Sequence, residues 1–168
     1  HVKAYVGGPN FHYFQYDMVS VGRRQVGSTI KPFLYALAME DGMSPCDLVP
    51  NVQPQVLLPS GDIWEPRNVP YGEAGKAEID PVPSLCLGIA DVSISEMTAA
   101  YTAFANKGIQ TEPLFVTRIE DNNGNIIATF TPRMNEIFSE ETASKMISLL
   151  QGVVNGGTGL RLRTKRYD

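Results

Sequence analysis

The clearest helical pattern lies in residues 30–39, where apolar positions recur every three or four residues. Four of these positions share one helical face: Phe33, Leu34, Leu37 and Ala38. Ser28 precedes this run and Gly42 follows it. The pattern therefore predicts a helix with Ser28 at its amino end and Gly42 beyond its carboxyl end.

Two further stretches predict helices with recognisable starts. For residues 93–106, Ser93 can serve as the N-cap, and Glu96, three positions later, completes a capping box. For residues 139–154, Ser139 can serve as the N-cap, and consecutive glycines follow the last apolar position. Both stretches are therefore expected to be helices with defined ends.

The remaining apolar patterns are typical of strands. Residues 2–6 alternate before a Gly-Gly-Pro turn, which predicts a strand. Residues 115–119 and 126–130 flank an Asn-Gly sequence, which predicts a hairpin. Residues 44–80 are rich in Pro and Gly and predict no regular element. Because strands and helices are mixed without βαβ alternation, we expect one α+β domain for the 168 residues.

The charge balance argues against a nucleic-acid partner. The formal net charge is −4, and a nucleic-acid surface would need clustered basic residues. One basic cluster lies near the carboxyl end, and we interpret it as a solvated strand or tail, with a phosphate or lipid contact as the less favoured alternative: Arg161, Arg163, Lys165 and Arg166. No apolar run reaches the length of a membrane span, so we expect any membrane anchor to lie outside this chain.

Cysteine and histidine content limits metal and triad chemistry. Cys46 and Cys86 form no C-x-x-C pair and have no histidine beside them, so no zinc site is predicted. Buried, unpaired thiols are the favoured interpretation, with a disulfide left open. His1 and His12 are the only histidines, which makes a Ser-His-Asp triad hard to build.

Residues 28–31 read Ser-Thr-Ile-Lys, an S-x-x-K motif. Residues three apart share a helical face, so the Lys31 side chain can reach back toward the Ser28 hydroxyl. A serine hydroxyl becomes a good nucleophile when a base takes its proton, and lysine can be that base in its neutral form. Ser28 and Lys31 are therefore the candidate catalytic residues. On this motif alone, a helix-capping serine and a solvated lysine would be the simpler interpretation.

The surroundings of the motif resemble the transpeptidase domain of class A (bifunctional) penicillin-binding proteins. Residues 24–33 read RQVGSTIKPF, against the family's typical RQPGSxxKPF. Further segments match the family in order: a first strand at 2–8, a W-x-P-x-N loop at 64–68, an S-x-x-E-M…F-A-N-x-G segment at 93–108, and V-V…G-T-G at 153–159. The sequence resembles family members of the Bacteroides group more than enterobacterial ones. The resemblance implies a partial penicillin-binding transpeptidase (β-lactamase-like) fold, with an antiparallel sheet packed against helices.

Two motifs that complete this family's active site are missing from the sequence. No S-x-N occurs, although the resemblance places it between about residues 75 and 81. The K-T/S-G motif would lie beyond Asp168. Three interpretations stay open: an ordered subset of a longer protein, a fragment with an excised subdomain, or a natural degenerate homologue. In each of them we expect the 168-residue chain alone to be a poor catalyst.

The resemblance also implies a reaction and partners. Ser28 would be acylated by D-Ala-D-Ala stem peptides of peptidoglycan and by β-lactams, without a metal or organic cofactor. The parent protein would be anchored on the periplasmic side of the inner membrane and would carry a glycosyltransferase domain. The alternatives are a non-catalytic penicillin-fold binding module and a β-lactam-hydrolysing or carboxypeptidase relative.

Overall fold

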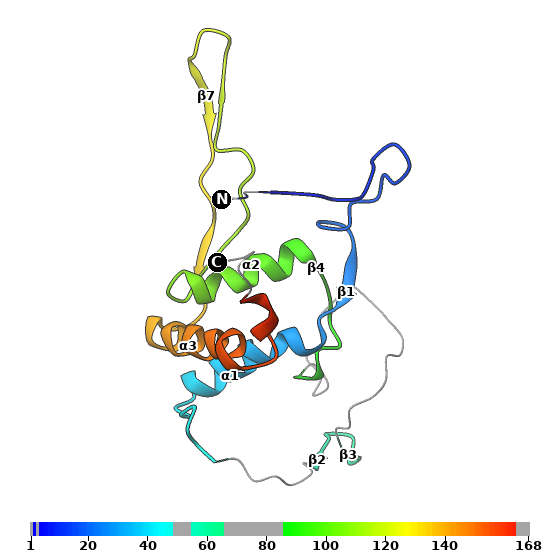
Figure 1. The fold of residues 1–168 in the computed structure, drawn as a ribbon, viewed down its shortest axis with the longest axis vertical. Coiled ribbons are helices and arrows are strands. Elements are labelled where there is room, and N and C mark those ends of the chain that lie inside the picture. Colours follow the sequence, from blue (N-terminus) through cyan, green and yellow to red (C-terminus); the bar gives the residue numbers. More distant parts are fainter. Residues whose placement is uncertain (1, 3, 49–54, 66–85, 164–168) are drawn as a thin grey trace.

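Three helices form the centre of the computed structural model: α1 (Lys31–Glu40), α2 (Ile94–Ala105) and α3 (Glu140–Gly156). The third helix packs against both of the others, as Figure 1 shows. The three come from distant parts of the sequence, so the centre of the molecule depends on long-range contacts. The structure describes residues 2, 4–48, 55–65 and 86–163.

The hydrophobic core lies where the three helices meet. Its buried members are Ala36, Ala103, Phe104, Phe138, Ala143 and Met146. The ring of Phe104 is only 2% exposed, and its centroid lies 4.9 Å from that of Phe33 and 5.1 Å from that of Phe138. Burying one such side chain stabilises the fold by roughly 1.5–3 kcal/mol. The alanines allow the helices to approach closely, and the aromatic rings fill the space between them.

The predicted serine caps are present. The Glu96 N–H donates to Ser93 Oγ at 3.2 Å, and the Ser93 N–H donates to Glu96 Oε2 at 2.7 Å, which completes the capping box. At α3, the Thr142 N–H donates to Ser139 Oγ at 3.2 Å. Both the N–H and the hydroxyl of Ser139 donate to Glu40 Oε1, at 2.9 and 2.8 Å. The end of α1 is therefore tied to the start of α3.

The described strands form four two-stranded antiparallel pairs, and the α+β class is confirmed. The pairs are β1 (Arg23–Gln25) with β4 (Asp91–Ser93), β2 (Val56–Leu57) with β3 (Ile63–Trp64), β5 (Ile109–Thr111) with β8 (Met134–Glu136), and β6 (Arg118–Glu120) with β7 (Ile126–Thr129). The first pair leads directly into the segment that carries Ser28.

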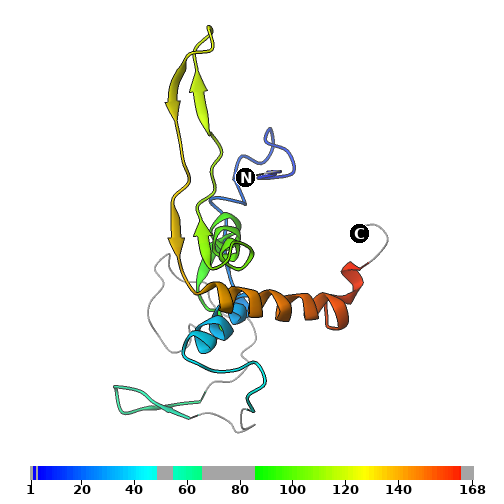
Figure 2. The ribbon, with the colours of Figure 1, turned by 90° about the vertical axis from the view of Figure 1, so that its left-hand side faces the viewer.

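The predicted hairpin is confirmed as β6 and β7, and it stands well away from the helices (Figure 2). Its turn is organised by Asp121, whose Oδ1 accepts the N–H groups of Asn123 and Asn125, both at 2.8 Å. Gly124 follows with φ at +84°. The first strand begins at Arg118, three residues later than the pattern predicted.

Three predictions are wrong. Residues 44–80, for which no regular element was predicted, contain the short pair β2 and β3. The described residues among 2–6 form no strand, because alternation alone cannot make one without a partner strand to pair with. Tyr5 instead donates its hydroxyl to the Asp17 carboxylate and sets its ring edge-on to Phe115. The two cysteines are unpaired as expected, but both are exposed rather than buried.

Neither a membrane-spanning helix nor a metal site appears in the described part of the chain. No helix there is long and apolar enough to cross a bilayer. The same residues contain no group of three or more His, Cys, Asp or Glu side chains arranged to hold a metal ion.

Candidate active site

The S-x-x-K motif lies at the start of the first helix. Ser28 is in η1 (Gly27–Ile30), a turn of 3-10 helix that runs straight into α1. Lys31 is the first residue of α1, and its N–H donates to the Ser28 carbonyl. The predicted helix is therefore confirmed, with Ser28 at its amino end. Gly42, with φ at +93°, follows its carboxyl end as expected.

A backbone ladder holds this turn in place from one side. Strands β1 and β4 pair from Arg23 opposite Ser93 to Gln25 opposite Asp91. The pairing continues past β1, because the Val26 N–H donates to the Ala90 carbonyl at 2.9 Å. The next residue adds a further bond, from the Gly27 N–H to the Gly88 carbonyl at 2.8 Å. The chain is thus anchored up to the residue before Ser28.

Two glycines make this close approach possible. Gly27 has φ at +52° and Gly88 has φ at +77°, a region that favours glycine. A Cβ atom at position 88 would lie 2.0 Å from the Gly27 carbonyl oxygen. The sequence pattern did not single out Gly88. In the sequence, Gly88 is an isolated glycine a few residues before a capping box. Such an arrangement is too common to indicate part of a site.

Helix α2 holds the same turn from another side. The Tyr101 hydroxyl donates to the Thr29 carbonyl at 2.8 Å. The Tyr101 ring meets the ring of Phe33 edge-on, with centroids 5.1 Å apart. It also lies 5.5 Å from the ring of Phe104. Burial raises the pKa of Tyr101, so the phenol remains protonated and able to donate at neutral pH.

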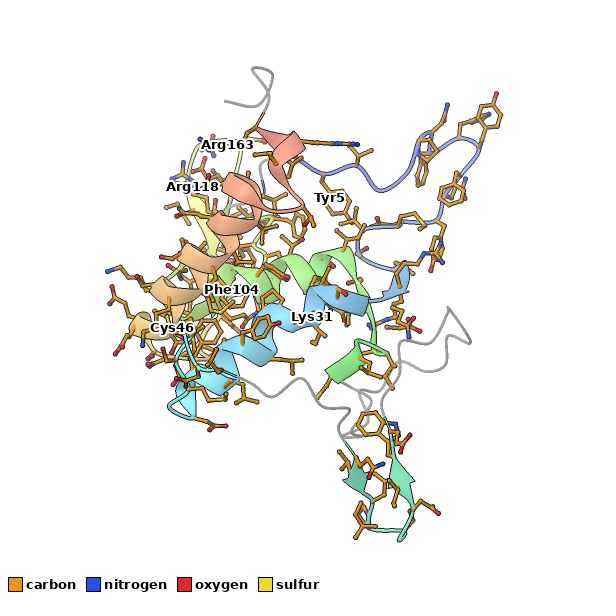
Figure 3. The ribbon with its side chains drawn as sticks, turned by 60° about the horizontal axis from the view of Figure 1, so that its bottom comes forward. Tyr5, Lys31, Cys46, Phe104, Arg118 and Arg163 are labelled. Carbon is orange, nitrogen blue, oxygen red and sulfur yellow. The ribbon has the colours of Figure 1, made fainter. Side chains whose placement is uncertain are left out.

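The two candidate catalytic side chains are exposed (Figure 3 labels Lys31 on the first turn of α1). No hydrogen bond or ion pair joins either side chain to another residue that the structure describes. The reach of the Lys31 amine to the Ser28 hydroxyl therefore stays a prediction. Within the same residues the Ser28 N–H also has no acceptor. It is a backbone donor at a helix start, where an anion is stabilised.

An ion pair reinforces the junction of β1 and α2. The Arg23 guanidinium lies 2.8 Å from Glu96 Oε1 and also donates to the Asp91 carbonyl at 3.2 Å. The Ser93 N–H, the Ser93 hydroxyl and Arg23 together hold the pKa of Glu96 below its usual value, against the effect of partial burial. The capping box is thus charged at neutral pH and bridges the two segments beside the nucleophile turn.

Several predicted features fall partly or wholly outside the described residues. Of the W-x-P-x-N segment, Trp64 lies in β3 opposite Val56, whereas 66–68 are outside. The expected position of the S-x-N motif, 75–81, is outside as well. In the basic cluster, Arg161 and Arg163 are exposed, and the other two members are outside.

An apolar groove of about 500 Å³ lies between α2 and α3. It is lined mainly by Tyr101, Phe104, Ile147, Leu150 and Val154. Neither Ser28 nor Lys31 lines it. The groove therefore adjoins α2 and α3, which support the candidate site, and does not contain the candidate reacting groups.

Comparison with known proteins gives a consistent result. The model of the penicillin-binding protein transpeptidase domain matches residues 82–167, just over half of the chain. Penicillin-binding protein 1A of Aquifex aeolicus is 29% identical over 95% of the chain, and penicillin-binding protein 2D of Bacillus subtilis is 26% identical over 97%. The chain spans 27% and 30% of the length of these two relatives.

Solved structures share the fold. Penicillin-binding protein 1A of Haemophilus influenzae superposes with a TM-score of 0.74 at 21% identity, over 92% of this chain and 33% of that one. The D,D-transpeptidase domain of a peptidoglycan glycosyltransferase from Eggerthella lenta gives 0.63 at 19% identity, over 89% of this chain and 53% of that one. These likenesses concern the fold alone.

Proposed function

This chain belongs to the penicillin-binding protein transpeptidase family, and on that premise we propose that Ser28 is the acylated nucleophile of a peptidoglycan D,D-transpeptidase. The observation that carries the proposal is the placement of the S-x-x-K motif. Ser28 sits at the amino end of α1, and Lys31 follows one turn later. The Ser28 N–H has no acceptor among the residues that the structure describes, so it adds a donor for an oxyanion.

The proposed acylation balances without a cofactor. Lys31 takes the hydroxyl proton of Ser28 as the Ser28 Oγ bonds to the carbonyl carbon of the penultimate D-alanine. The Ser28 N–H stabilises the oxyanion, and the intermediate collapses by breaking the peptide bond. Lys31 passes the proton it took from Ser28 to the departing D-alanine amine, and an acyl ester remains on Ser28. The amino group of a neighbouring stem peptide then attacks this ester and releases the serine.

The partners and location follow from the family as further parts of this proposal. The donors are D-Ala-D-Ala stem peptides, and β-lactams acylate the same serine. The protein would act at the periplasmic face of the inner membrane, with an anchor and a glycosyltransferase domain elsewhere in the polypeptide.

Acylation by a fluorescent penicillin tests the proposal in the intact protein. Wild type should acquire one label, which peptide mapping should place on Ser28. Ser28→Ala should abolish the label, and Lys31→Ala should slow labelling by about 10²–10⁴-fold. Ser148→Ala, an exposed serine in α3, serves as the matched control. Labelling that persists in Ser28→Ala would refute the assignment.

A second candidate is a non-catalytic penicillin-fold module. It is favoured by the absence of any S-x-N motif from the sequence and by the exposure of the Lys31 side chain. Such a module would bind β-lactam or peptidoglycan without an adduct at Ser28. A hydrolytic relative would instead form the adduct and lose it quickly. Mass spectrometry of the labelled protein over time separates these outcomes.

A further inference from the structure

The turn that carries Ser28 is held on two sides by contacts of different kinds. On the strand side the contacts are backbone hydrogen bonds, ending with the Gly27 N–H donating to the Gly88 carbonyl at 2.8 Å. On the helix side the contact is a side chain, the Tyr101 hydroxyl, which donates to the Thr29 carbonyl at 2.8 Å. The two contacts lie on the residues immediately before and after Ser28. A change at Tyr101 would therefore release one side of the turn and leave the other intact.

Tyr101 is well placed to fix the position of this carbonyl. Its ring is half-buried and lies edge-on to Phe33 at 5.1 Å, with an interplanar angle of 90°. Phe104, itself in the core, contacts it from its own helix at 5.5 Å. A ring held on two sides has little rotational freedom, so its hydroxyl is kept at one point in space. The core thereby determines where the Thr29 carbonyl lies.

We infer that Tyr101 is a positioning residue for the acylation of Ser28. The inference rests on the proposed function. The Thr29 carbonyl is one residue from Ser28, so fixing it restricts rotation of the η1 turn. That restriction limits the positions that the Ser28 hydroxyl and N–H can take relative to the first turn of α1, where Lys31 lies. Preorganised donors and nucleophiles lower the barrier to acyl transfer, whereas a turn free to rotate must be ordered during the reaction.

Tyr101→Phe tests the inference in the intact protein, because it keeps the ring and removes only the hydroxyl. Tyr35→Phe is the matched control, since Tyr35 is on α1 and its side chain is 58% exposed. Stopped-flow labelling with a fluorescent penicillin separates the noncovalent binding constant from the acylation rate constant. The stoichiometry of labelling reports the fraction of folded protein. We expect the acylation rate constant of Tyr101→Phe to fall roughly three- to tenfold, with binding and stoichiometry unchanged.

The possible results separate this inference from the proposed function. If wild type labels at Ser28 and Tyr101→Phe behaves like Tyr35→Phe, the positioning role is refuted and the proposed function stands. If the labelling stoichiometry of Tyr101→Phe instead falls as much as its acylation rate does, the loss reflects unfolded protein. Tyr101 is then structural only, and the inference is refuted. If wild type gives no adduct at Ser28, the proposed function fails and the inference fails with it.

Hydrogen exchange supplies a measurement that does not depend on catalysis. In Tyr101→Phe, the amides of residues 27–31 should exchange several-fold faster than in wild type. The amides of α3 should exchange at the wild-type rate, as should all of these amides in Tyr35→Phe. Equal exchange of residues 27–31 in wild type and Tyr101→Phe would show that the phenol does not hold the turn, and would overturn the inference.

Discussion

The α-carbon of Gly88 faces the carbonyl of Gly27 so closely that a methyl group on it would lie 2.0 Å from the carbonyl oxygen. The contact is between two backbone segments, so no side-chain rotation can relieve it. Because Gly27 immediately precedes Ser28, any displacement here moves the candidate nucleophile. Gly88 therefore shapes the site although it contributes no reacting group.

Gly88→Ala should impair both stability and labelling of Ser28. The left-handed backbone alone costs an alanine about 1–3 kcal/mol, and the clash with Gly27 adds to this cost. Gly124→Ala is the matched control, because Gly124 also has positive φ but no atom lies within 4 Å of the point that its added methyl group would occupy. Urea unfolding should show a larger loss for Gly88→Ala. Equal losses in the two variants would show that the close approach is unimportant.

Ser93→Ala should destabilise the fold by about 1 kcal/mol. Ser93 is 1% exposed, and its hydroxyl accepts the Glu96 N–H at the start of α2. Removing the hydroxyl leaves that N–H without its partner. The comparison variant is Ser148→Ala. In the wild type, the exposed hydroxyl of Ser148 donates to the Ser144 carbonyl inside α3 and does not cap a helix. A thermal shift no larger than that of the comparison variant would contradict the capping role.

Glu96 should make the folded state sensitive to acid. Its pKa is lowered on folding from a usual 4.5, chiefly by the Ser93 N–H, so folding favours its charged form. The stabilisation is complete above pH 4.5 and is lost as the pH falls through the lowered value. Glu96→Gln should therefore be less stable than wild type at pH 7, with a difference that narrows toward acid pH. Urea unfolding at several pH values measures this, and a constant difference would refute it.

Asp17 should anchor the amino-terminal loop down to unusually low pH. The Ser20 and Tyr5 hydroxyls and the Val19 N–H hold its pKa at about 2, against a usual 3.8. The anchoring is complete above pH 3.8 and is lost as the pH falls through about 2. The amide exchange rates or the tyrosine resonances of this loop should therefore change as the pH falls from 3.8 through about 2.

Asp17→Asn should free the same loop already at neutral pH. The neutral amide has one acceptor oxygen and no charge, so it cannot replace the carboxylate as acceptor of the bonds from Tyr5, Val19 and Ser20. Asp41→Asn, at an exposed position after α1, should leave the loop as it is. A loop whose exchange is the same in wild type and Asp17→Asn at pH 7 would show that the carboxylate does not organise it.

Phe104→Ala should destabilise the protein by about 3–5 kcal/mol. The side chain fills the space where the three helices meet, and its ring centroid lies 4.9 Å from that of Phe33 and 5.1 Å from that of Phe138. Phe11, which is 75% exposed in the amino-terminal loop, gives the matched control. Phe11→Ala should change the free energy of unfolding by less than about 1 kcal/mol. Similar values for the two variants would show that the core is placed wrongly.

The helices and their ends were predictable because their signals are local. Ser93 and Ser139 cap helices where the sequence predicted them, since a cap needs only the next few residues. The β6–β7 hairpin was predictable for the same reason, as its turn residues lie between its strands. The short strands β1 and β4 were not, because three residues each carry too little pattern and their pairing joins distant parts of the chain.

The candidate site was predictable only in part. The S-x-x-K spacing placed Ser28 at a helix start, which the structure bears out. The supports of the turn were invisible, because Gly88 and Tyr101 reach it through tertiary contacts rather than through spacing. The prediction that both cysteines are buried was wrong for a related reason. Composition gives the usual burial of a residue type but says nothing of where a particular residue lies in the fold.

The central three-helix packing also bears on how this architecture tolerates insertion. Glu40 at the end of α1 meets Ser139 at the start of α3, a contact that spans 99 residues. The entropy of closing such a loop grows only with the logarithm of its length, by about 0.6 kcal/mol for each doubling. Extra segments between these helices would therefore add little thermodynamic cost. Length variation between α1 and α3 can accumulate among related sequences while the same three helices continue to pack.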